Sequence, residues 1–195
     1  MTGKVEDLII QAVEIDGGAM DISYDQTVEI KARCTGGHGL LREALLSHGA
    51  AFAGEFEQSD TFYNVRDGRL KLRRSTAGSL LIAYRRPDQT GPKNALVDLH
   101  PTDDPDSLDR ALASVLGVRL VVEKTRALYT LDNIRFHLDR VKGLGDFVEI
   151  EVMGKRGMDS IENLHSTCRK WLEILGIKEA ALVDRAYADL LESGG

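Results

Sequence analysis

The sequence predicts an α+β fold in which short antiparallel strands form one sheet and helices pack against it. Apolar and charged residues alternate repeatedly, as in Val28-Glu-Ile-Lys-Ala-Arg33, which is the spacing of a strand with one apolar face. Short turn segments such as Asp67-Gly68 separate neighbouring strands, and strands joined so closely pair antiparallel. Elsewhere apolar residues recur at helical spacing, so helices are available to cover the apolar face.

The first half of the chain is predicted to contribute mostly strands. The first of them is expected over residues 27–34, where the alternation is clearest. Leu41, Ala44 and Leu45 lie on one side of a helix that we expect over residues 40–47. Further strands follow, the first interrupted by the Asp-Gly turn and the second ended by a proline; their ranges are 60–74, 80–86 and 95–99.

The second half is predicted to alternate between helices and strands. Asp104 and Pro105 begin a helix that runs to Gly117, because aspartate caps a helix well and proline suits its first turn. Asp159 and Glu162 have the spacing of a capping box at the start of a later helix. The remaining elements are strands over 119–129, 134–141 and 147–153, and helices over about 161–175 and 179–192.

These elements predict one domain over residues 27–192. Residues 1–26 form an N-terminal extension, in which residues 5–15 fit either a short helix or an edge strand. A chain of 195 residues is long enough for one well-packed core.

Composition narrows the classes of function. The net charge of −6 provides no general positive field for nucleic acid, which we therefore do not expect as a partner. Cys34 and Cys168 are too few for a disulfide framework and read as small apolar residues in a reducing compartment. The N-terminus lacks a signal peptide, and no apolar run approaches a membrane span, so we expect a cytoplasmic protein without membrane contact.

Charged residues occupy the second face of the predicted strands in an ordered way. Cations recur in pairs at a spacing of two, and carboxylates occur on strands in the same way. For a single pair, a solvated sheet face with weak surface ion pairs is the simpler explanation. The repetition on several strands favours a binding function instead. The cations are Lys31, Arg33, Lys71, Arg73, Arg86, Lys124 and Arg126, and the carboxylates are Glu29, Asp139, Glu149 and Glu151.

This combination suits the recognition of a polyphosphate. Lysine and arginine form charge-assisted hydrogen bonds with phosphate oxygens. Convergent carboxylates are the ligands that Mg²⁺ or Mn²⁺ prefers, and these ions bridge protein and phosphate oxygens. The sequence contains no Gly-rich phosphate loop of the G-x-x-x-x-G-K-[ST] type, which argues against a P-loop nucleotide hydrolase.

Six segments in order resemble the signature blocks of the CYTH family, the triphosphate tunnel metalloenzymes that include class IV adenylyl cyclases and thiamine triphosphatases. The resemblance extends over about residues 27–191 and is strongest to the class IV cyclase branch. The segments are Val28–Arg33, Asp60–Val65, Gly68–Arg73, Ala83–Asp88, Glu123–Arg126 and Leu138–Glu151, followed by Asp184–Leu191 at the C-terminal end.

The resemblance implies an eight-stranded antiparallel barrel, a tunnel whose charged face points inward, with helices outside. It also implies that the seven cations line the phosphate path, with Lys31 and Lys124 as catalytic candidates. Glu29, Asp139, Glu149 and Glu151 would then hold Mg²⁺ or Mn²⁺. The family motif has a glutamate where this chain has Thr27, so one metal-facing carboxylate is missing.

The sequence favours the first of three functions and leaves the other two as alternatives. The first is cyclisation of ATP to cyclic AMP and pyrophosphate. The second is hydrolysis of inorganic triphosphate or of an organic one such as thiamine triphosphate. The third is binding of a polyphosphate or nucleotide without catalysis, which Thr27 keeps open. No residue is an evident reader of adenine, and a homodimer is left open.

Overall fold

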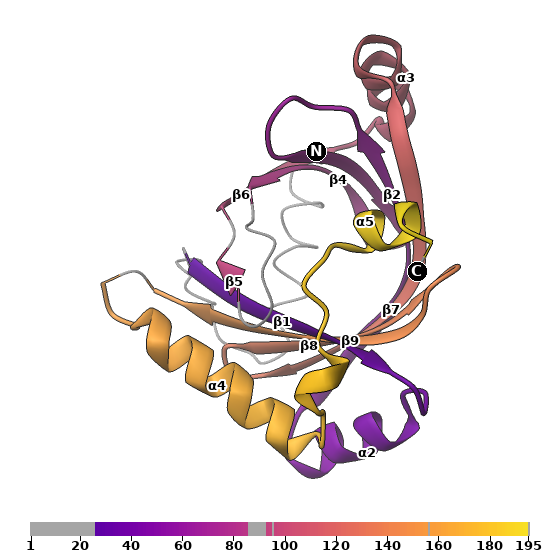
Figure 1. Cartoon of the computed structure of the whole chain (residues 1–195). Coiled ribbons are helices and arrows are strands. Elements are labelled where there is room, and N and C mark those ends of the chain that lie inside the picture. Colours follow the sequence, from indigo (N-terminus) through magenta and orange to yellow (C-terminus); the bar gives the residue numbers. More distant parts are fainter. Residues whose placement is uncertain (1–25, 86–92, 95, 156, 195) are drawn as a thin grey trace.

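The computed structural model describes residues 26–85, 93–94, 96–155 and 157–194, and in these ranges the chain forms one antiparallel sheet of nine strands with helices beside it (Figure 1). The predicted α+β class is therefore confirmed. The strands are β1 (Gln26–Cys34), β2 (Ala51–Tyr63), β3 (Arg69–Ser75), β4 (Gly78–Arg85), β5 (Lys93–Asn94), β6 (Leu96–Thr102), β7 (Val118–Leu131), β8 (Ile134–Val141) and β9 (Gly145–Gly154).

The sheet is strongly curled, as a barrel requires. Its strand order is β5-β1-β9-β8-β7-β2-β3-β4-β6, and every neighbouring pair is antiparallel. The two strands at the ends of this order, β5 and β6, are separated by one residue in the chain. Counted as one interrupted strand, they bring the number of strands to the predicted eight and lie between β4 and β1 in the curled sheet (Figure 1).

The described helices are α2 (Gly39–Ser47), α3 (Pro105–Leu116), α4 (Ile161–Ile174) and α5 (Tyr187–Glu192), with a 3₁₀ turn η1 (Glu179–Ala181). Helix α4 packs against β1 and β9 from outside the curl (Figure 1). Its apolar stripe includes Leu164, Cys168 and Trp171, all of which are buried. The Trp171 ring meets the ring of Phe136 of β8 edge-on, with the two ring centroids 4.7 Å apart. None of the described helices is long and apolar enough to cross a membrane.

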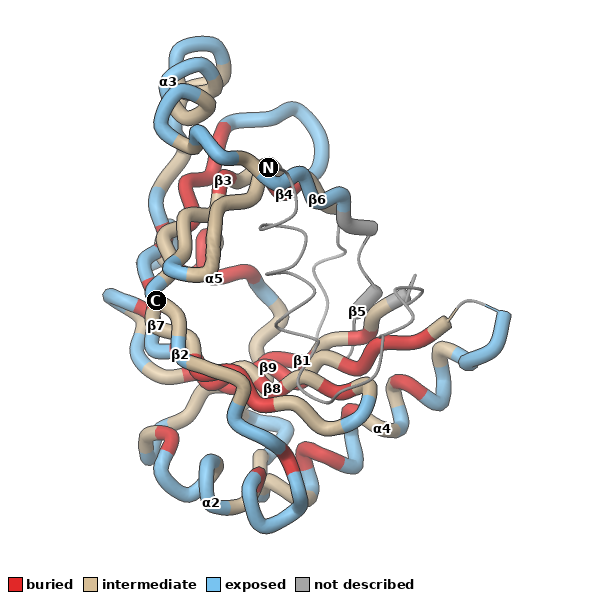
Figure 2. Tube along the Cα trace, turned by 180° about the vertical axis from the view of Figure 1, so that it is seen from behind, coloured by how far each residue is buried: buried red, intermediate tan, exposed pale blue. Residues whose placement is uncertain are grey.

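Burial divides the molecule into an outer and an inner side of the sheet. The outer apolar residues of β1, β8 and β9 form the main core with α4, and Figure 2 shows buried positions concentrated along these strands. A second, smaller core contains Phe62, Phe147 and Tyr187, where α5 packs against the inner side. On β1 and along most of β8 and β9 the period of two therefore sends apolar residues to the outer side and charged ones to the inner side, except where α5 packs on apolar inner residues such as Phe147. Cys34 and Cys168 are both free thiols.

Two local predictions are wrong. The cap of α4 is Ser160, whose side chain accepts from the Asn163 amide at 3.2 Å, while Asp159 accepts from the Lys155 amide instead. The helix expected over 179–192 is interrupted between η1 and α5, and the backbone of Leu182 and of Ala186 is extended. The Val183 amide donates to the Lys31 carbonyl at 2.9 Å, so a bond to β1 replaces a helical one.

The structure also contains strand residues that the alternation did not predict. Strand β2 begins at Ala51, before the expected range, and pairs along its length with β7. Residues 1–25, with the proposed alternatives for residues 5–15, and the loop up to residue 92 lie outside the described ranges.

Candidate active site

Cross-strand register gathers charged side chains on the inner side of the sheet. Lys31 of β1 is the partner of Glu149 of β9, and Glu149 is the partner of His137 of β8. On the opposite wall, Asp60 of β2 is the partner of Arg73 of β3. Partners in an antiparallel pair project to the same face, so these residues face a common interior.

These charged side chains form one cluster with two halves, and Asp60 lies at the centre of the first half. Its side chain accepts from the Lys71 Nζ at 2.8 Å and from the Arg73 Nε and Nη2 at 2.7 and 2.8 Å. The residue is 2% exposed. Although burial alone would raise the pKa of the Asp60 carboxyl, the charges of Arg73 and Lys71 hold it well below its usual range. Asp60 is therefore a permanent anion that orients two cations.

Asp139 and Arg126 form the centre of the other half. The Arg126 guanidinium donates to both Asp139 oxygens, at 2.7 and 2.6 Å, in the bidentate geometry that favours this pair. Arg126 Nη2 also reaches Glu149 Oε2 at 2.6 Å. The Tyr187 hydroxyl of α5 donates to Asp139 Oδ2 at 2.9 Å. Asp139 is fully buried, and both of its carboxylate oxygens accept hydrogen bonds from Arg126 or Tyr187.

Glu149 connects this half to β1 and β8. Lys31 Nζ lies 2.9 Å from Glu149 Oε1, and His137 Nδ1 lies 3.4 Å from Glu149 Oε2. Burial would raise the pKa of the Glu149 carboxyl, but Lys31 and Arg126 hold it well below its usual range. Lys31 also lies over the Tyr187 ring, 3.9 Å from its centroid.

Lys124 stands between the two halves. Its Nζ is 3.9 Å from both Asp60 Oδ2 and Asp139 Oδ2, longer than a direct hydrogen bond. Burial, followed by repulsion from Arg126, lowers the pKa of Lys124 to about 7. Burial and the neighbouring Arg73 lower the pKa of Lys71 to about 8. Both lysines can therefore change charge near neutral pH.

The cluster holds more positive than negative groups. Five cations, Lys31, Lys71, Arg73, Lys124 and Arg126, face the three carboxylates Asp60, Asp139 and Glu149. Burying paired charges usually stabilises a protein less than apolar packing of the same volume. An excess of buried positive charge is costlier still, so this arrangement suits an anionic ligand rather than stability.

A pair of carboxylates lies beside this cluster. Glu29 of β1 and Glu151 of β9 are direct cross-strand partners. Like charges in such positions repel, and a bound cation relieves the repulsion. Glu151 Oε2 lies 3.8 Å from His137 Nε2 and 3.7 Å from Arg135 Nη1. Within the described residues, no three His, Cys, Asp or Glu side chains are already gathered as a metal cage. The donors fit Mg²⁺, which commonly uses one or two carboxylates together with phosphate oxygens.

The structure places the remaining predicted residues elsewhere. Arg33 donates to the Leu144 carbonyl at 3.1 Å and lies over the Phe147 ring, at one end of the inner face. Arg86 lies outside the described residues. The other predicted residues gather in the cluster or in the carboxylate pair beside it.

Two residues of the site, Asp60 of the cluster and Tyr187 beside it, were not predicted from the sequence. Asp60 lies in residues 60–66, where apolar and charged residues do not alternate, so the strand pattern did not assign it to the charged face. Tyr187 looked like part of the apolar stripe of a helix. Burial and the Asp139 charge raise the pKa of Tyr187 well above its usual value, so the hydroxyl remains a hydrogen-bond donor. The signal that could have indicated both is their position inside the family-like segments.

Comparison with known proteins places the fold. The sequence matches the CYTH domain over residues 25–187. A structure from Pyrococcus horikoshii is 25% identical, with a TM-score of 0.76, covering 84% of this chain and 98% of that chain. A candidate adenylate cyclase from Vibrio parahaemolyticus is 18% identical, with a TM-score of 0.68, covering 85% and 97%. An RNA triphosphatase from Schizosaccharomyces pombe is 13% identical, with a TM-score of 0.50, covering 94% and 92%. A search among curated proteins found no match.

Proposed function

Because the chain belongs to the CYTH domain family, we propose that it is a metal-dependent enzyme that cyclises ATP to cyclic AMP and pyrophosphate. The observation that carries the proposal is the buried cluster, in which five cations outnumber three carboxylates. A triphosphate supplies the negative charge that such a cluster lacks. The likeness of the fold to a candidate adenylate cyclase supports the choice of reaction.

Each cation has a role in gripping the phosphates. Lys71 and Arg73 are oriented by Asp60, and Arg126 is oriented by Asp139, so these groups are in position before the ligand arrives. Preorganised donors stabilise developing charge without the cost of reorientation. Lys31 can exchange its contact with Glu149 for one with a phosphate oxygen. The carboxylates therefore hold the cations apart and in place.

Lys124 is our first catalytic candidate. It stands between the two halves of the cluster, with its Nζ 3.9 Å from both Asp60 Oδ2 and Asp139 Oδ2. As the ammonium, which binding of the phosphates favours, it can stabilise the pyrophosphate that leaves. Lys31 remains a second catalytic candidate, since it approaches the same centre from β1 across the Tyr187 ring.

We assign the metal to Glu29 and Glu151, with Glu149 as a neighbour. Asp139 was part of the expected ligand set, but it is bound on both oxygens by Arg126 and also by Tyr187, so our proposal leaves it out. A bound Mg²⁺ or Mn²⁺ would neutralise phosphate charge at this end of the site. Thr27 precedes Glu29 on the same face of β1, and it cannot add a carboxylate there.

Hydrolysis of a triphosphate is the second candidate function. It is favoured by the composition of the cluster itself, because every charged group in it suits phosphate or metal and none is specific to a ribose. The RNA triphosphatase with the same fold shows that this architecture occurs in proteins of that class.

Product analysis tests the proposal. The protein is incubated with ATP or with inorganic triphosphate, in Mg²⁺ or Mn²⁺, and the products are separated by chromatography. Cyclic AMP and pyrophosphate support the cyclase. ADP with phosphate, or cleavage of inorganic triphosphate, supports the hydrolase instead. Tight binding without any product would identify a non-catalytic binding protein. The same assay is run on Lys124→Met, which removes a catalytic candidate. Lys142→Met is its control, because Lys142 is an exposed lysine outside the cluster.

A further inference from the structure

Arg135 of β8 lies against the carboxylate pair that we assign to the metal. It is the cross-strand partner of Glu151, and its Nη1 lies 3.7 Å from Glu151 Oε2. It shares the inner face of β8 with His137 and Asp139, because residues two apart in a strand project to the same side. A cation therefore stands beside a carboxylate that has been assigned to a second cation.

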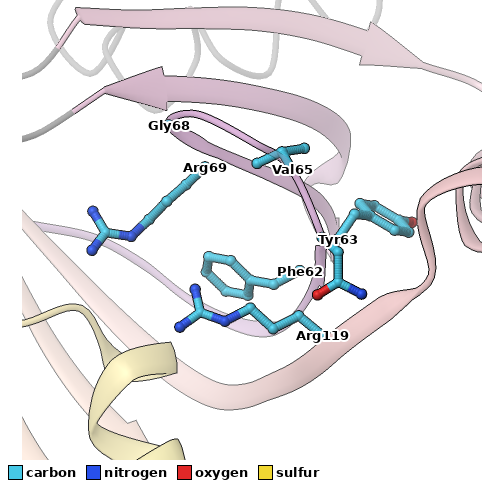
Figure 3. Close-up of a pocket in the computed structure, with 7 residues that line it drawn as sticks. Phe62, Tyr63, Val65, Gly68, Arg69 and Arg119 are labelled. Carbon is cyan, nitrogen blue, oxygen red and sulfur yellow. The ribbon is translucent and has the colours of Figure 1, made fainter.

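The contact of Arg135 is looser than those of other arginines on the inner side of the sheet. Arg69 and Arg119 (Figure 3) donate to Asp189 at 2.8 and 3.0 Å. The 3.7 Å between Arg135 and Glu151 is too long for a hydrogen bond, and within the described residues no other group holds this guanidinium. The two side chains are 25% and 22% exposed, so a small ion can reach the carboxylate. Arg135 is thus attracted to Glu151 by charge and remains able to exchange it for another anion.

The balance of charge decides what this end of the site can hold in the free protein. Glu29 and Glu151 supply two carboxylates, and Thr27 adds none. The guanidinium of Arg135 offsets one of them, which leaves a divalent ion a local charge of about −1. A triphosphate changes this balance, because its oxygens can bind the ion and the guanidinium at the same time. The site is therefore poor in negative charge for an ion alone and suited to an ion that arrives with phosphate.

We propose that Arg135 competes with the metal for Glu151 in the free protein, so that a divalent ion enters the site only together with a triphosphate. The proposal rests on the proposed function and adds the order of loading to it. When the metal–triphosphate complex binds, the guanidinium exchanges Glu151 for a phosphate oxygen, and Glu151 becomes available to the metal. Arg135 acts through Glu151 and is a positioning residue rather than a catalytic one.

A substitution that removes the charge of Arg135 tests this competition without an activity assay. Arg135→Met keeps much of the side-chain length, Arg135→Gln repeats the test with a polar side chain, and Arg135→Lys retains the charge. Arg140→Met is the matched control, because Arg140 lies on the same strand, is 70% exposed and pairs with Asp146 at 3.0 Å. Electron paramagnetic resonance measures the binding of Mn²⁺ alone to each protein. Calorimetry then measures the Kd of a non-hydrolysable ATP analogue with and without Mn²⁺.

We expect Arg135→Met and Arg135→Gln to bind Mn²⁺ alone about tenfold more tightly than the unmodified protein, because the competing charge is gone. Arg135→Lys and Arg140→Met should keep the weak affinity of the unmodified protein for Mn²⁺. A variant that merely folds poorly would lose affinity for the ion instead of gaining it. If Arg135→Met and Arg135→Gln leave the affinity for Mn²⁺ alone unchanged or weaken it, or if Arg140→Met tightens it equally, Arg135 does not control loading. If the unmodified protein binds the analogue no better with Mn²⁺ than without it, the proposed metal site itself is wrong.

Discussion

The lowered pKa values of Lys124 and Lys71 predict that triphosphate affinity falls as the pH rises. A lysine that is neutral in the free protein must take up a proton before it can pair with a phosphate. Lys124, with a pKa of about 7, is half neutral at pH 7 and almost wholly neutral at pH 9. A singly esterified phosphate has a second pKa of about 6. Inorganic triphosphate carries a terminal phosphate at each end and loses its last proton at higher pH, so the protonation of the free ligand is measured in the same buffers and subtracted.

The magnitude follows from the linkage between proton binding and ligand binding. If Lys124 is fully charged in the complex, its contribution weakens the affinity about fiftyfold between pH 7 and pH 9. Lys71, with a pKa of about 8, adds about tenfold over the same interval on the same assumption. The free protein should respond in the opposite direction. Its folded state binds fewer protons than the unfolded chain above pH 7, so these two lysines make stability rise with pH.

Calorimetry with inorganic triphosphate and EDTA, in buffers of different ionisation enthalpy, measures both the Kd and the number of protons taken up. Lys124→Arg keeps the charge at every pH used and should remove the fiftyfold part of the slope. Lys142→Arg is the control, because Lys142 is exposed and paired with Glu123 at 2.6 Å. A Kd that is constant from pH 7 to 9, without proton uptake, would refute the assignment of these lysines as neutralised groups.

Three further substitutions test individual contacts. Glu151→Gln should abolish metal-dependent turnover and leave the melting temperature nearly unchanged, because the apolar face of β9 is untouched; full activity that still requires metal would contradict the ligand set. Thr27→Glu should tighten Mg²⁺ or Mn²⁺ binding in the presence of a non-hydrolysable triphosphate, and an unchanged calorimetric Kd would show that position 27 does not contact the metal. Tyr187→Phe removes the hydrogen bond to Asp139, whose acceptor is charged and buried. The free energy of unfolding, measured in urea, should therefore fall by about 1.5–3 kcal/mol. A loss below about 0.5 kcal/mol would mean that Asp139 is satisfied without the tyrosine hydroxyl.

Much of the cluster could be predicted because a strand has a simple period. Once Val28 and Ile30 are assigned to the core, Glu29 and Lys31 must face the other side, and the same argument places Glu149 and Glu151. The pairing of β7 with β8 and of β8 with β9 follows from the short turns between them. The pairing of β1 with β9, with Lys31 opposite Glu149, required the structure.

The parts that escaped prediction depend on contacts between distant segments. In β2, Glu55 and Glu57 are exposed while Asp60 is buried, so charge there does not mark the inner face. The break between η1 and α5 accompanies the hydrogen bond from the Val183 amide to the Lys31 carbonyl, which no local propensity encodes. That bond positions the chain just before Tyr187, whose ring reaches Lys31 and Lys124. Local periodicity alone therefore assigned the tyrosine to a helix stripe.

The pairing of β1 with β9 has a consequence for how the chain folds. These strands lie near opposite ends of the described sequence, so their ladder closes a long loop, and contacts of high sequence separation form slowly. The β7-β8-β9 meander consists of hairpins and can form early, with Arg126, Asp139 and Glu149 still hydrated. Lys31 joins Glu149 only when β1 docks. We therefore expect desolvation of the charged interior to come at the last stage of folding, and the cluster to be complete only once β9 has been synthesised.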